Sequence, residues 1–305
     1  MKKCIVLFIV LTIFVLTIIF HGKIVNFIVD HFSEMNKKAT VLENNRYASD
    51  TNYMYVKLTD NFFPENKQDI MNIYYTIINS GMTDFVFYCS KDYDNCLEDV
   101  NYISNNQKML SYINNFVPVY NSFKNIETEF DSLGKVSVHI THNYSKSEIN
   151  EINKKLEYII DNVIKDDASE KEKIKAIHDY IINNTKYDKE RSDDNVDKYK
   201  SDTAYGALIQ GYSICGGYAD SVKLLLDHYN IPNFKVSSEN HIWNVVKINN
   251  KWLHLDLTWD DPVTNTGEDV LEYNYFLITG EELEKLETEQ HKYDLEVYKE
   301  LEKAK

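Results

Sequence analysis

The chain has 305 residues, with 33 Lys and Arg against 48 Asp and Glu, which gives a formal net charge of −15. This acidic balance excludes a general phosphate-binding surface, because proteins that bind nucleic acid by counterion release need a basic face. A hydrophobic share of 43% with 13% aromatic residues is too rich for a disordered chain. We therefore expect one or two folded domains around a real core, and no nucleic-acid partner.

The beginning of the chain is set apart from the rest. Residues 4–20 (CIVLFIVLTIFVLTIIF) form an uncharged, almost wholly apolar run between Lys2, Lys3 and Lys23. The run has the length of a short membrane-spanning helix, and no small-residue cleavage site follows it. We therefore predict that residues 1–31 are a cytoplasmic tail and an uncleaved membrane anchor; a removed signal peptide is the alternative. The lysines before the run place the body of the protein outside the cytoplasm.

In residues 32–165 short apolar runs are separated by Asn, Asp and Ser residues, which predicts a smaller α+β region with a linking helix. Strand-like alternation covers 84–89 and 135–141, and helical spacing covers 67–78 and 105–115. Cys89 and Cys96 flank a turn-rich stretch, so a local disulfide is compatible with a position outside the cytoplasm, but the sequence does not decide it.

Two capping boxes then open two successive helices, one at Ser145 to Glu148 and one at Ser169 to Glu172. We place the boundary to the last domain, 166–305, between these helices. The polar run 188–202 has almost no apolar residues and is predicted to be a surface loop. A third box, Thr279 to Glu282, predicts a charged final helix running toward Lys303.

No metal or cofactor site is predicted. His139 and His142 have opposite parity on one strand, so they face opposite sides and do not chelate one ion. The acidic loop 260–269 lacks the ligand spacing of a calcium-binding loop.

The chemically most informative residue is Cys215. Around it the sequence changes from a glycine-flanked loop to helical spacing, which predicts a cysteine at a helix N-terminus. Free N–H groups and the helix dipole favour the thiolate at this place. Gly216 and Gly217 are expected to leave room for a molecule to approach the sulfur.

Two strand-like segments, 241–248 and 251–258, flank Asn249 and Asn250, a pair that tolerates the positive φ of a two-residue hairpin turn. Ile248 then pairs with Lys251. In this register one face of the hairpin is aliphatic and forms a core side, and the other, polar face carries His241 and Asp256 within reach of each other.

A thiolate, an imidazole that activates it and a carboxylate that orients the imidazole are the parts of a nucleophilic cysteine site. Cys215, His241 and Asp256 provide them. His254 is a rival base on the same face, and Asp260 and Asp261 are rival orienting groups. The residues alone do not bring the cysteine to the hairpin.

The segments GYSICGGYA (211–219), HIWNVV (241–246) and KWLHLDLTWD (251–260) resemble the core motifs of the transglutaminase-like superfamily, especially its microbial members. The resemblance covers about residues 166–280. It implies a papain-like α+β fold, in which the helix that bears the cysteine packs on an antiparallel sheet. It also implies Cys215 as the nucleophile, His241 as general base and acid, and Asp256 as the orienting residue.

The function expected from these residues is acyl transfer on protein or peptide amides, some of them associated with the cell wall, through a thioester on the cysteine. A lysine amine as acceptor gives a crosslink, whereas water gives proteolysis or deamidation. The alternative is a membrane-anchored module that uses the same fold to bind peptides or wall components without turnover.

Overall fold

The computed structural model describes residues 20, 21, 23, 42–90, 92–262, 270–286 and 288–302. Within these ranges no helix combines the length and the apolar character needed to cross a membrane. The predicted anchor at 4–20 lies, apart from Phe20, outside the described residues and stays a prediction.

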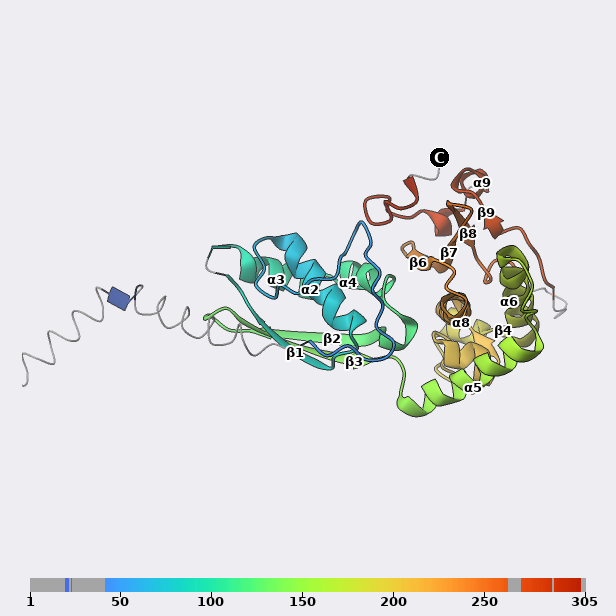
Figure 1. The fold of residues 1–305 in the computed structure, drawn as a ribbon, viewed down its shortest axis with the longest axis horizontal. Helices are drawn as coiled ribbons and strands as arrows, with labels where there is room; N and C mark the ends of the chain where they lie inside the picture. Colours follow the sequence, from blue (N-terminus) through green and yellow to red (C-terminus); the bar gives the residue numbers. More distant parts are fainter. Residues whose placement is uncertain are drawn as a thin grey trace, which may run out of the picture.

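The N-terminal region contains a three-stranded antiparallel sheet in the order β1-β3-β2. The strands are β1 (Asp84–Tyr88), β2 (Phe123–Phe130) and β3 (Lys135–His142). Three helices lie along one side of this sheet, namely α2 (Lys67–Asn79), α3 (Cys96–Asn105) and α4 (Gln107–Asn114) (Figure 1). The short 3-10 helix η1 (Val119–Asn121) precedes β2.

The four elements predicted in this region are confirmed with small shifts at their ends, whereas β2 and α3 were not predicted. In β2 Ile126 is buried while most of its neighbours are exposed, so the strand has no apolar alternation to detect. Cys89 and Cys96 form a disulfide, with their Cα atoms 5.7 Å apart. This bond ties the end of β1 to the start of α3.

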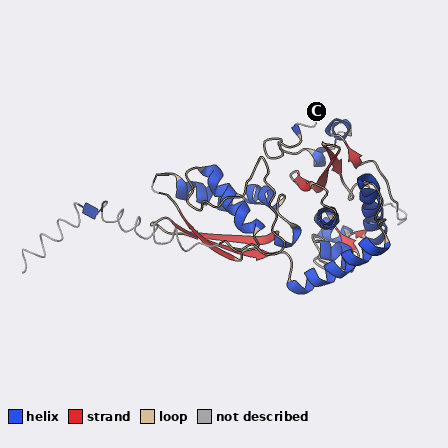
Figure 2. Cartoon of the chain, in the orientation of Figure 1, coloured by secondary structure: helices blue, strands red, loops and turns tan. Residues whose placement is uncertain are grey.

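The two regions are joined through α5 (Lys146–Asn162), which α6 (Glu170–Asn184) follows. Both predicted capping boxes are present, at Ser145 and at Ser169. The apolar residues of α5 belong to the same buried cluster as those of α6 and of the cysteine helix. Figure 2 shows the two larger sheets as separate units.

The second region is built on a four-stranded antiparallel sheet in the order β6-β7-β8-β9. Its strands are β6 (Asn233–Ser237), β7 (Ile242–Ile248), β8 (Lys251–Leu255) and β9 (Phe276–Ile278). Helix α8 (Cys215–His228) packs on β7, where the Asn244 amide donates to the Ala219 carbonyl oxygen at 3.0 Å. The expected architecture, a cysteine helix on an antiparallel sheet, is therefore present.

The short elements before α8 complete this region. β4 (Lys186–Tyr187) and β5 (Tyr212–Ser213) form a parallel pair. Between them lie α7 (Lys189–Asp194) and the π-helix η2 (Gly206–Gln210).

The predicted hairpin register is confirmed. Ile248 pairs with Lys251, and the pairing continues in step to Asn244 opposite Leu255. Asn249 and Asn250 have φ values of 49° and 62°, as a two-residue turn with positive φ requires.

Both faces of the hairpin are buried, so the expectation of one polar face is wrong. The aliphatic face packs against α8, whereas Trp243 and Val245 on the other face join a cluster with Phe116 of the N-terminal region and Tyr298 near the C-terminus. Segments distant in sequence cover this face, and the residue pattern of the hairpin does not predict which segments these are.

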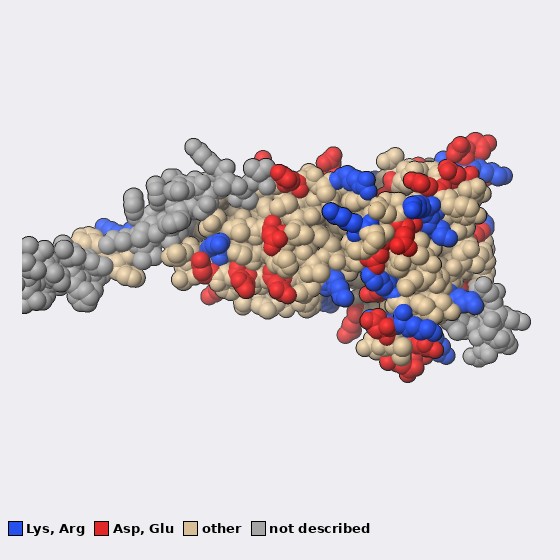
Figure 3. All heavy atoms as spheres, turned by 90° about the horizontal axis from the view of Figure 1, so that it is seen from below, with Lys and Arg blue, Asp and Glu red and all other residues tan. Residues whose placement is uncertain are grey.

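The predicted long final helix is also wrong. The capping box at Thr279 is present, but α9 (Gly280–Lys285) is short and is followed by the 3-10 helix η3 (Glu289–His291) and by turns up to Glu302. Tyr298 and Leu301 are buried in the cluster shared with the N-terminal region, so packing decides the path of this segment. We call residues 288–302 the C-terminal segment. On the face seen in Figure 3, acidic and basic side chains are interspersed over both regions.

Candidate active site

Cys215 is the first residue of α8, as predicted. Ile214 precedes it as the N-cap and has no side-chain acceptor, so no side chain caps the N–H groups at the helix start. The cysteine is half-buried and lines a cleft of about 710 Å³ together with Gly216 and His241. One wall of this cleft comes from α4 of the N-terminal region.

The two glycines after the cysteine have a role different from the predicted one. A Cβ atom on Gly216 would lie 2.7 Å from the carbonyl oxygen of Asp202, and one on Gly217 would lie 2.6 Å from that of Ser201. The space beside the helix start is thus taken by the chain itself. The end of the run predicted as a surface loop is buried here, because the Ser201 hydroxyl donates to the buried carboxylate of Asp188.

His241 and Asp256 meet as the hairpin predicts. His241 lies just before β7 and its Nε2 donates to Asp256 Oδ2 at 2.6 Å. Both are buried, with exposed fractions of 6% and 2%. Because Nε2 is engaged, Nδ1 is the nitrogen left for Cys215, whose side chain is hydrogen-bonded to His241. The structure therefore brings the three predicted residues together.

The electrostatics of this pair favour a charged imidazole. Burial lowers the pKa of His241, but the charge and hydrogen bond of Asp256, together with Cys215, outweigh burial and raise this pKa to about 10. Burial raises the pKa of Asp256, yet His241 and His291 lower it to a value well below the usual range. Asp256 is therefore an anion that holds a proton on His241.

His291 is a site residue that the sequence did not reveal. Its Nε2 lies 2.8 Å from the same Asp256 Oδ2 that His241 contacts, and its Nδ1 lies 2.6 Å from Thr288 Oγ1. It comes from η3, beyond the resembling motifs and within a charged stretch. No spacing or pattern connects it to the hairpin, so residue type was the one available signal.

Aromatic rings enclose the three polar side chains. Trp243 stacks on His241 with ring centroids 5.6 Å apart, and Tyr275 stacks on His291 at 4.8 Å. Trp259 packs edge-on against both imidazoles. This enclosure removes water and strengthens the interactions of the carboxylate.

The rival residues have other partners. His254 Nδ1 accepts a hydrogen bond from Trp243 Nε1 at 3.0 Å, and burial together with the nearby His291 lowers the pKa of His254 to about 3. Asp260 contacts His178 Nε2 at 3.2 Å, and Asp261 accepts from the Tyr218 hydroxyl. These contacts leave Asp256 as the carboxylate that orients His241.

His241, Asp256 and His291 form the one group of potential metal ligands found among the described residues, with ligand atoms within 4.8 Å of one another. Two ligands on a tetrahedral zinc, each about 2.0–2.1 Å from the ion, are about 3.3 Å apart. The two nitrogen–oxygen distances, 2.6 and 2.8 Å, are shorter and are hydrogen-bond distances. Protons account for this arrangement, so we assign no metal to it.

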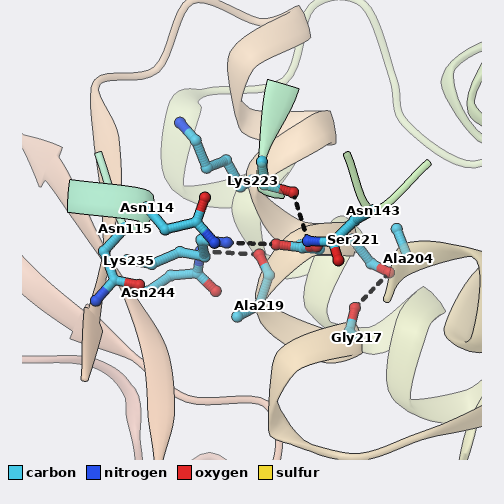
Figure 4. A network of polar contacts seen from close by, with 12 residues as sticks. Asn114, Asn115, Asn143, Ala204, Gly217, Ala219, Ser221, Lys223, Lys235 and Asn244 are labelled. Carbon is cyan, nitrogen blue, oxygen red and sulfur yellow. Dashed lines mark hydrogen bonds and ion pairs between the residues drawn. The ribbon is translucent and has the colours of Figure 1, made fainter. Parts of the chain in front are cut away.

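The floor of the cleft is a buried polar network. Lys235 Nζ lies 2.6 Å from Asp220 Oδ1, and the Tyr144 hydroxyl donates to Asp220 Oδ2 at 2.6 Å. Asn115 donates to Ser237 Oγ at 2.8 Å, which links the end of α4 to β6. Figure 4 shows this meeting of the two regions, with Asn115 and Lys235 close together.

A cysteine at a helix start, packed against an antiparallel sheet that presents a histidine and a carboxylate, is the arrangement of enzymes with a nucleophilic thiol. Residues 157–257 match the model of the transglutaminase-like superfamily. This match covers less than half of the chain and includes Cys215, His241 and Asp256, so over these residues the chain is similar to that superfamily.

Solved structures and curated proteins were compared as well. One structure, described as a TGase, has a TM-score of 0.31 and 18% sequence identity over 45% of this chain and 44% of that chain. Another, a protein of Cytophaga hutchinsonii described as a candidate cysteine protease, has a TM-score of 0.28 and 15% identity over 48% of this chain and 65% of that chain. This chain thus spans less than two thirds of either protein. No curated protein matches the sequence.

Proposed function

We propose that this protein is a thiol enzyme that transfers acyl groups from protein or peptide amides through a thioester on Cys215. The observation that carries the proposal is the connected series Cys215, His241 and Asp256 at the edge of a cleft. The superfamily match supports the same class of chemistry.

The geometry suggests the following steps. The Cys215 thiolate attacks the amide carbonyl, and the N–H groups at the start of α8 stabilise the oxyanion. The imidazolium of His241 then gives its Nδ1 proton to the departing amine as the carbon–nitrogen bond breaks, which leaves a thioester and a neutral imidazole. In the second half His241 takes a proton from the acceptor, either an amine or water, and the thiolate is restored.

Alkylation of Cys215 by iodoacetamide tests the reactive thiol without a known substrate. We expect alkylation near neutral pH to be faster than that of a model cysteine, and His241→Ala to remove the advantage. Cys215→Ala is the matched control, because it keeps every other cysteine. A thiol no more reactive than the model compound would favour the non-catalytic binding module instead.

Screening with glutamine-containing and other peptides then separates the acceptors. Incorporation of a labelled amine identifies a transglutaminase, and release of ammonia or of a peptide fragment identifies deamidation or proteolysis. Processing by Cys215→Ala at the rate of the unmodified protein would contradict the thioester.

We also propose that residues 4–20 anchor the protein with its body outside the cytoplasm. The Cys89–Cys96 disulfide supports this location, since disulfides persist in oxidising compartments. Cell fractionation should find the full chain in membranes and a chain that lacks residues 1–31 elsewhere. Recovery of the full chain in the soluble fraction would contradict the anchor.

A further inference from the structure

The carboxylate of Asp256 is surrounded by donors on both oxygens. Its Oδ1 accepts from the backbone N–H of Thr258 at 3.0 Å and of Trp259 at 3.4 Å. Its Oδ2 is shared by His241 at 2.6 Å and His291 at 2.8 Å. An ionised carboxylate offers about four acceptor positions, so His291 completes the set.

The direction of the His291 hydrogen bond follows from its two partners. An ionised carboxylate only accepts, so the proton lies on His291 Nε2. Its Nδ1 shares a hydrogen bond with the Thr288 hydroxyl, 2.6 Å away. The ring is held in place, because it is 5% exposed and stacks on Tyr275 with an interplanar angle of 16°.

We propose that His291 is a positioning residue for the reactive pair. It donates to the same oxygen of Asp256 that receives His241, and it thereby keeps this carboxylate ionised and aimed at the imidazole. A part for His291 in catalysis rests on the function proposed above, whereas the effect of His291 on the Cys215 thiol can be measured without a substrate.

The other titratable groups around Asp256 do not replace this donor. His254 is bonded to Trp243, and Asp260 is bonded to His178. The groups whose charges act on Asp256 or are acted on by it are His241, His291, His254, Asp260 and Tyr275. Among them only the first two donate a side-chain hydrogen bond to this carboxylate in the described part of the chain.

The C-terminal segment that carries His291 is fastened to the N-terminal region. The Tyr298 hydroxyl accepts from Asn115 Nδ2 at 2.8 Å, and Glu300 Oε1 accepts from the backbone N–H of Met54 at 2.6 Å. The place of His291 therefore depends on residues on both sides of the superfamily match at 157–257. This connection gives the N-terminal region a part in setting the reactive pair.

The test compares His291→Gln with His291→Phe in the full chain. The glutamine amide keeps a donor near the place of Nε2, whereas the phenylalanine keeps the ring and removes the donor. The rate of Cys215 alkylation by iodoacetamide is measured from about pH 4 to pH 9. We expect His291→Phe to move the acid limb of this profile up by about one pH unit, the size of one hydrogen bond to a charged group, because Asp256 then aims the imidazolium of His241 at the thiolate less well. His291→Gln should restore the limb.

A role in packing alone predicts a different result. It would leave the acid limb unmoved and lower the rate equally at every pH, or it would affect both variants alike, and either result overturns the proposal. If His291→Phe fails to fold, Thr288→Val removes the hydrogen-bond partner of Nδ1 instead. We then expect a smaller shift in the same direction, and an unmoved limb overturns the proposal. Failure to find an amide substrate would contradict the proposed function. It would not change the measured effect of His291 on the alkylation of Cys215.

Discussion

The β7–β8 hairpin and the C-terminal segment each bring one imidazole to the same carboxylate, yet they do so in different ways. The hairpin places His241 near Asp256 through strand pairing, which a period of two and a turn pair encode locally. The C-terminal segment places His291 through a 3-10 turn and through anchors on the N-terminal region. A site can thus combine one partner that is encoded locally with one that depends on distant packing.

Removal of the shared carboxylate should break both connections at once. Asp256→Ala leaves two buried imidazoles without their acceptor, and we expect a loss of about 3–5 kcal/mol in the free energy of unfolding, measured with urea. A lowered folded pKa of Asp256 contributes stability above about pH 4, and the raised folded pKa of His241 contributes stability below about pH 6.5. The loss should therefore be largest between these values.

The loss in the free energy of unfolding caused by Asp256→Ala should depend on pH. It should shrink as the pH rises from about 6.5 toward the His241 pKa of about 10, and as the pH falls through the folded pKa of Asp256. A loss that does not depend on pH would show that packing, not the paired charges, is responsible.

An uncharged replacement for Asp256 tests whether its charge sets the pKa of His241 on the hairpin. Asp256→Asn keeps the size of the side chain but removes the charge that raises the pKa of His241 to about 10. We expect the pKa of His241 to fall toward the ordinary value of about 6.5, as followed by NMR of the imidazole ring. Asp261→Asn is the matched control, since that carboxylate is bonded to Tyr218. An unchanged His241 pKa in Asp256→Asn would disprove the electrostatic account.

The anchor of the C-terminal segment can be weakened without contact with Asp256. Tyr298→Phe removes the hydroxyl that accepts from Asn115 Nδ2 and from the backbone N–H of Ser237 at 2.9 Å. Unsatisfied buried donors predict a loss of about 1–3 kcal/mol in the free energy of unfolding. We also expect the acid limb of Cys215 alkylation to move in the direction of His291→Phe. Destabilisation with an unmoved limb would separate the anchor from the site.

The smallest expected effect lies in the hairpin turn. Asn250 has a φ of 62°, a conformation that alanine disfavours by about 1–2 kcal/mol and glycine adopts freely. Asn250→Ala should therefore lower the free energy of unfolding by about 1 kcal/mol, and Asn250→Gly should leave it nearly unchanged. Equal effects of the two substitutions would show that the turn tolerates another register.

The local parts of the site were predictable from the residues. The cysteine at a helix start, the hairpin register and the capping boxes at Ser145 and Ser169 all appear as predicted. Each depends on neighbours in sequence or on one pair of adjacent strands, so a pattern of a few residues is enough. The roles of Gly216 and Gly217 were mistaken because the carbonyl oxygens that approach them come from another loop.

The sequence by itself was enough to propose the class of chemistry, since it contains a cysteine, a histidine and a carboxylate in an order and spacing that resemble those of the superfamily. Tertiary structure alone decided that Cys215 reaches the hairpin, that Asp256 prevails over Asp260 and Asp261, and that His291 joins the site. The physical reason is that local periodicity records which face of an element is apolar. It does not record which distant segment will cover that face.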